Sequence, residues 1–129
     1  MRRDGASSNK DDWTDHCAAA ALNSLGALAV VPDGELVRDP ALRRLLRAVA
    51  DEAASTGLRV TGAPARIAAD RCRRHPHHRQ LWQRALRQGR KTGAEAVLGP
   101  ILQAARRAGK PVPKLAIIAE ALRRLDKKR

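Results

Sequence analysis

The 129-residue chain contains no phenylalanine and no tyrosine, and only two tryptophans. A core without these rings must be built from leucine, isoleucine, valine and alanine. Because alanine and leucine favour helices, while strands favour β-branched and aromatic residues, this composition indicates an all-α protein. Neither the period-two alternation of strands nor an internal repeat is present, and the length fits one domain. We therefore expect a single domain of about six helices.

Cysteines are equally scarce, since Cys17 and Cys72 are the only two. Two cysteines do not make a disulfide framework, and no secretory signal precedes them. We therefore expect reduced thiols and a cytoplasmic protein. The apolar stretch from Cys17 to Val31 is too short to span a bilayer and is interrupted by Asn23 and Ser24. This stretch indicates a buried helix, and we expect no membrane partner.

Acidic residues are half as numerous as basic ones, which gives a formal net charge of +13. Two interpretations stay open: an anionic partner such as nucleic acid or another polyanion, or the codon bias of a GC-rich genome. The densest basic segment, residues 66–91, holds eight arginines and one lysine against Asp70. On a helical pair it would form a face that follows phosphates, or simply a solvated face. Because only Trp82 could stack on bases, such binding should be weak and indifferent to sequence.

Turn and capping residues divide the chain into segments. Asp39 before Pro40 is a strong helix start, Thr92 can cap another helix, and Gly109 can end it. The residues 32–34, Pro-Asp-Gly, predict a turn. We expect a disordered leader over residues 1–12, a helical domain over 13–126 and a basic tail over 127–129. The expected helices cover residues 13–30, 39–57, 64–74, 77–88, 93–108 and 114–126.

One cluster contains residues that can bind metals: Cys72, His75, His77 and His78. Its spacing lacks the distant second pair of ligands that a structural zinc site needs, and neighbouring arginines would repel a cation. We therefore expect no metal site and interpret the segment as a solvated basic loop.

Several segments, in their order and separation, carry a resemblance to a known family. They are Trp13, the sequence Pro-Asp-Gly-Glu-Leu at 32–36, Asp-Pro at 39–40, residues 90–100, and the Gly-Lys-Pro-Val-Pro connection at 109–113. Together they resemble the C-terminal helical domain of ketopantoate reductase (2-dehydropantoate 2-reductase) over about residues 13–125. The resemblance implies a 6-phosphogluconate-dehydrogenase C-terminal-like helical bundle. The family's activity is the NADPH-dependent reduction of 2-dehydropantoate to pantoate, in pantothenate synthesis.

The resemblance also shows at which catalytic and substrate-binding positions this sequence differs from the family. The family's first helix follows W-x-K-x-x-x-N-x-x-x-N-P, in which the Lys is the general acid and the Asn residues bind the keto acid. Here Asp15 stands at the Lys position, Ala19 at the first Asn and Asn23 at the second. Asn23 is thus the one candidate substrate-binding residue, or else an amide bonded to a neighbouring backbone carbonyl. An Asp is ionised at neutral pH and cannot protonate an alkoxide.

The family's second motif is also altered, and we do not expect its cofactor domain within this chain. In T-E-I-D-x-x-N-G, the Glu binds substrate, and here Gly93 stands at that position. We therefore assign no catalytic residue. Only 12 residues precede Trp13 and no G-x-G-x-x-G occurs, so we expect no cofactor in this chain, and NADPH only with a Rossmann-domain partner.

In the family, the first helix faces the Rossmann domain across a crevice. The apolar residues Ala18 to Ala21, Leu22 and Leu25 therefore predict an exposed patch, through which the chain associates with a Rossmann partner or a second copy. Two functions remain: a reductase-like domain, truncated or degenerate and inactive alone, or a non-catalytic basic module that binds nucleic acid or other polyanions.

Overall fold

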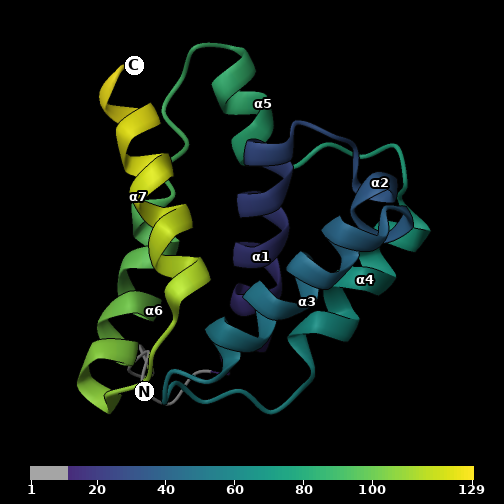
Figure 1. Cartoon of the computed structure of the whole chain (residues 1–129). Helices are drawn as coiled ribbons and strands as arrows, with labels where there is room; N and C mark the ends of the chain where they lie inside the picture. Colours follow the sequence, from purple (N-terminus) through teal and green to yellow (C-terminus); the bar gives the residue numbers. More distant parts are fainter. Residues whose placement is uncertain (1–11) are drawn as a thin grey trace, which may run out of the picture.

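The computed structural model describes residues 12–129, and over this range the chain forms helices and no strand (Figure 1). The helices are α1 (Thr14–Ala29), α2 (Asp33–Arg38), α3 (Pro40–Ala54), α4 (Pro64–Arg74), α5 (Leu81–Arg87), α6 (Glu95–Ala108) and α7 (Pro113–Lys127). The expected all-α fold is confirmed. Residues 1–11, most of the expected leader, lie outside the described range.

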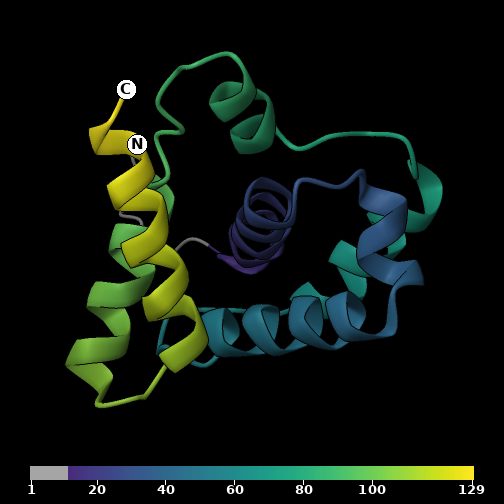
Figure 2. The same cartoon turned by 45° about the horizontal axis from the view of Figure 1, so that its top comes forward.

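Helix α1 is the centre of the fold. Viewed almost along its axis, it is surrounded by α3, α5, α2 with α4, and the antiparallel pair α6 and α7 (Figure 2). The expected exposed patch is therefore wrong. Ala18, Ala20, Ala21, Leu22 and Leu25 are each at most 3% exposed, and only Ala19 in this stretch is half-buried. The apolar patch through which we expected the chain to bind a partner is covered by the chain's own helices.

Helix α2 replaces the turn that we expected at residues 32–34. The backbone N–H of Asp33 donates to His78 O at 2.9 Å, and that of Gly34 donates to Pro76 O at 2.8 Å. A Cβ on Gly34 would lie 2.8 Å from the Pro76 Cβ. Glycine is therefore needed here so that α2 can pack closely against Pro76. Leu36 is fully buried. The helix is stabilised by contacts with a loop some 40 residues away, which local turn chemistry does not reveal.

Several of the expected helix boundaries are confirmed, among them both ends of α4. Asp39 Oδ1 accepts hydrogen bonds from the backbone N–H groups of Ala41, at 2.9 Å, and Leu42, at 3.1 Å, at the start of α3. Gly109, with φ 65°, ends α6.

Other boundaries differ from expectation. Helix α3 ends at Ala54, before the expected Gly57, and α5 begins at Leu81 instead of residue 77 because the preceding loop is bonded to α2. Thr92 accepts from the N–H of Ala94 as expected, but α6 itself begins at Glu95. The hydroxyl of Thr92 also donates to Asp126 of α7 at 2.6 Å, which fixes the start of α6 against the end of α7.

Both cysteines are free and completely buried. Burial raises the pKa of the Cys17 thiol to about 11 and that of Cys72 to about 12, so both remain protonated at neutral pH. None of the helices within residues 12–129 has the length and apolar character needed to cross a membrane.

Candidate functional site

Three positions that the resemblance marks lie in one row along α1. Asp15, Ala19 and Asn23 recur every four residues, and side chains with this spacing share one face of a helix. Asp15 is exposed, while Ala19 and Asn23 are half-buried. The row therefore lies on an accessible part of a helix that is otherwise largely covered, with His16 and Leu28 as its other exposed residues.

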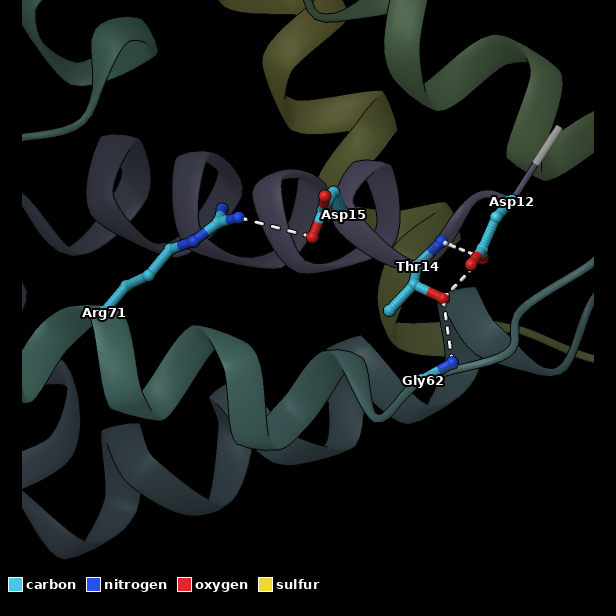
Figure 3. A network of polar contacts seen from close by, with 5 residues as sticks. All are labelled: Asp12, Thr14, Asp15, Gly62 and Arg71. Atoms are coloured by element: carbon cyan, nitrogen blue, oxygen red, sulfur yellow. Dashed lines mark hydrogen bonds and ion pairs between the residues drawn. The ribbon is translucent and has the colours of Figure 1, made fainter.

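Asp15 is paired with an arginine from a different helix. Its Oδ1 lies 3.4 Å from Nη2 of Arg71 on α4, and the two side chains are 77% and 39% exposed (Figure 3). Such a solvated pair contributes little stability. Arginine keeps its proton throughout the physiological pH range, and a carboxylate at neutral pH has none to give. Asp15 therefore differs in charge from the cationic residue that the resemblance places at this position.

The start of α1 is held by a network beside Asp15. The backbone N–H of Thr14 donates to Asp12 Oδ1 at 3.0 Å, and the N–H of Gly62 donates to Thr14 Oγ1 at 3.0 Å (Figure 3). Hydrogen bonds from Thr14 and then Thr61 hold the pKa of Asp12 well below its usual range. Asp12, which we placed in the disordered leader, instead belongs to the fold and fixes where Asp15 lies.

Asn23 uses both ends of its amide within the protein. Its Nδ2 donates to the carbonyl oxygen of Ala19 at 3.0 Å, and its Oδ1 accepts from the backbone N–H of Trp82 at 3.1 Å. The second bond satisfies a free N–H in the first turn of α5, as a capping residue would. The substrate-binding role of Asn23 stays a prediction, because a ligand would have to compete with these two bonds.

Gly93, at the position of the family's substrate-binding Glu, lies exposed in the connection before α6. Its φ is 74°, which favours glycine, and nothing lies within 4 Å of where a Cβ would be. No hydrogen bond within the described range joins it to α1. Position 93 therefore has no side chain that could bind a substrate, and it makes no hydrogen bond to the row on α1.

A cleft of about 530 Å³ opens beside this row. Its wall comes from α1, the start of α2, α4 and the loop that follows it: Ala19, Leu22, Asp33, Arg71, Arg74, His75, His78 and Gln80. We had placed Asp33 in a turn and both arginines on a general basic face. Asp33 lies between the apolar residues 30–32 and Leu36, but nothing in this local pattern separates a buried carboxylate from a turn residue.

Asp33 is the unusual group in this cleft. It is 2% exposed, and its Oδ2 accepts from Gln80 Nε2 at 2.7 Å, whereas its Oδ1 has no hydrogen-bond partner within the described range. Burial raises the pKa of Asp33, while the bond from Gln80 and the charges of His78 and His75 act against that rise.

The arginines of the basic segment 66–91 do not all line the same cleft. Arg66 and Arg73 line a groove of about 470 Å³ between α3 and α4, whereas Arg71 and Arg74 line the cleft beside α1. The groove also takes residues from outside the segment. Its charged residues are Arg43, Arg44, Arg47, Asp51, Arg66 and Arg73.

Comparisons with known proteins identify the fold. Residues 8–126 match the family described as ketopantoate reductase PanE/ApbA, C-terminal. The chain belongs to this family. A PanE/ApbA family ketopantoate reductase from Ralstonia eutropha JMP134 superposes with a TM-score of 0.78 at 22% identity, over 90% of this chain and 40% of that one. A probable 2-dehydropantoate 2-reductase, panE, from Bacillus subtilis gives 0.77 at 26% identity, over 90% and 42%.

This ketopantoate reductase C-terminal domain thus spans about two fifths of the length of those two solved proteins. A comparison with curated proteins gives no match. The expected relationship and helical fold are confirmed, whereas the activity of the full-length enzymes is not thereby shown for this chain.

The described residues form helices only. Within residues 12–129 there is no strand, so the βαβ unit whose Gly-rich turn holds a dinucleotide cannot form there.

The candidate metal ligands do not assemble either. Cys72 is buried in the core, while His75, His77 and His78 are exposed on the loop after α4. Among the residues described, no group of three or more His, Cys, Asp or Glu side chains could hold a metal ion.

Proposed function

We propose that this chain is the helical domain of a ketopantoate-reductase-like protein and that it does not reduce 2-dehydropantoate on its own. The observation that carries the proposal is the pair of Asp15 and Arg71 at 3.4 Å, at the place where the family has its cationic acid. Reduction of a keto group needs a proton for the developing alkoxide. Neither member of this pair can supply it at neutral pH.

Gly93 supports the same proposal. A carboxylate that binds substrate is absent at this position, and the backbone with φ 74° would strain any side chain placed there. Restoring only one of the two groups should therefore not restore activity, since the cofactor would also lack a binding site.

The test is a turnover assay with the purified chain, NADPH and 2-dehydropantoate. We expect no rate above the uncatalysed background for the natural sequence or for Asp15→Lys. Asp51→Lys, an acid-to-lysine change at another exposed position, on α3, is the matched control. Turnover by the natural chain would contradict the proposal directly.

A Rossmann-domain partner, or a second copy of the chain, belongs to the same proposal, but it would have to use a surface other than the apolar residues of α1, which the chain's own helices cover. Sedimentation at physiological salt, with and without an added Rossmann domain of this family, measures association. We expect a complex with the added domain. A chain that stays monomeric in both samples would remove the partner from the proposal and leave an independent domain.

Weak polyanion binding is the second candidate, favoured by the groove between α3 and α4. Five arginines and one aspartate give its lining a formal charge of +4 (5 − 1). Arg44 and Arg66 have no ion pair within the described range, so both guanidinium groups can contact phosphates. No large apolar side chain is exposed on α3 or α4, which favours a phosphate backbone over a membrane surface.

We expect a short duplex DNA to be retained at low salt without sequence preference. Each phosphate contact contributes about −0.9 to the slope of log K against log salt. Arg44→Gln and Arg66→Gln should each reduce the slope by about 1, whereas Arg107→Gln on α6 should not. Fluorescence anisotropy over a salt series measures this, and a salt-insensitive or sequence-selective complex would refute it.

A further inference from the structure

The cleft beside α1 contains a buried acceptor that the protein leaves unused. Asp33 is 2% exposed and its Oδ1 has no hydrogen-bond partner within the described range, although Oδ2 is bonded to Gln80. A buried carboxylate oxygen without a donor costs free energy, and such atoms in native proteins call for a specific explanation. Asp33 is one of the residues that line the cleft of about 530 Å³, so a ligand in the cleft lies beside this carboxylate, and a small shift of the Asp33 side chain would bring Oδ1 to a ligand's donor.

The rest of the cleft selects an anion. Arg71 and Arg74 of α4 and the imidazoles of His75 and His78 all line it, and Asp33 is the only acid among its lining residues. Arg74 makes no ion pair with any described residue, and Arg71 makes only the long, solvated pair with Asp15. The cleft therefore combines cations that can receive an anionic group with one buried atom that needs a hydrogen-bond donor.

We propose that this cleft binds a small hydroxylated phosphate monoester, with its phosphate against Arg71 and Arg74 and one of its hydroxyl groups donating to Asp33 Oδ1. Two guanidinium groups with adjacent imidazoles match a dianion with three free oxygens better than a single carboxylate. A hydroxyl group suits Asp33 better than an ammonium group or a metal ion, since both arginines would repel a cation.

The apolar part of the wall fits the remaining atoms of such a ligand. Ala19 and Leu22 of α1 present methyl groups to the cleft, against which a short carbon chain can lie. Of the positions that carry substrate-binding side chains in the family, only Ala19 lines the cleft, and its methyl group forms no hydrogen bond. Binding would thus depend on residues to which the family relationship assigns no role.

Isothermal titration with two probes tests the hydroxyl contact without altering Asp33. Glycerol 3-phosphate carries both the phosphate and the hydroxyl groups, whereas ethyl phosphate carries the phosphate alone. A hydrogen bond to a charged group predicts that glycerol 3-phosphate binds at least about tenfold more tightly. Equal affinity for the two compounds, or no saturable binding of either, would overturn the proposal.

Variants separate the two halves of the site. Arg74→Gln, an exposed change that leaves the core intact, should weaken both compounds about tenfold, while Arg107→Gln on α6 should change neither. Asp33→Asn should remove the preference for glycerol 3-phosphate and retain the binding of ethyl phosphate. If Arg74→Gln and Arg107→Gln have the same effect, the phosphate binds the general positive charge of the protein and the proposed site is wrong.

Discussion

Replacing Asn23 with alanine should destabilise the domain, because its amide connects α1 to the start of α5. Asn23 Oδ1 accepts from the backbone N–H of Trp82 at 3.1 Å, and Trp82 is 5% exposed. Alanine leaves this buried N–H without a partner, at a cost of about 1–3 kcal/mol. The bond from Nδ2 to Ala19 O adds only about 0.5 kcal/mol, since loss of the donor leaves a carbonyl within a helix. The expected loss is therefore about 2 kcal/mol.

Urea unfolding followed by far-UV circular dichroism measures this loss, and thermal unfolding should show a Tm lower by about 6–10 °C. Asn23→Asp is the matched control, because its carboxylate keeps an acceptor for Trp82 N–H and loses only the donor. Its stability should stay within about 1 kcal/mol of the natural chain. If Asn23→Ala unfolds within about 0.5 kcal/mol of the natural chain, the capping role is refuted.

Two further changes test the fold around the candidate site. Gln83→Met should lower the free energy of unfolding by about 2–3 kcal/mol, because Gln83 is 1% exposed and its Nε2 donates to Gly26 O at 2.7 Å and Val31 O at 2.8 Å. Gln103→Met on the exposed face of α6 is its control, and equal losses in urea would contradict this role. Burial raises the pKa of Asp33. At pH values just above the ordinary pKa of 3.8, the native state therefore binds more protons than the unfolded state. The contribution of Asp33 to stability should therefore fall as pH rises through this window and then level off. The stability difference between the natural chain and Asp33→Asn, followed over pH, should show this fall, and a difference that grows with pH would refute it.

Local signals in the sequence were enough to predict most of the helices. Asp39 before Pro40 and Gly109 after an apolar stripe act on the backbone within a few residues, so their effect is visible without the tertiary structure. The burial of α1 was also predictable, since its alanines and leucines run nearly all round the helix.

Helix α2 and the cleft could not be predicted in this way. The N–H groups of Asp33 and Gly34 find their acceptors in the loop around Pro76 and His78, and the tight contact of Gly34 arises only when that loop is in place. The cleft likewise combines α1 and α2 with α4 and the loop after it, which lie dozens of residues further along the chain. A sequence read locally shows Asp33 in a turn and Arg74 in a charge run, and it cannot show that they face one cavity.

On α1, three positions correspond to catalytic or substrate-binding residues of the family. In this structure they differ in how much the fold depends on them. The exposed pair of Asp15 with Arg71 contributes little to stability, and Ala19 has no polar side chain, so both positions can vary without loss of the fold. Asn23 is different, because the N–H of Trp82 depends on its amide oxygen. The presence of asparagine at this position is therefore explained by the packing of α5 on α1, and it is not by itself an indication that the chain binds a keto acid.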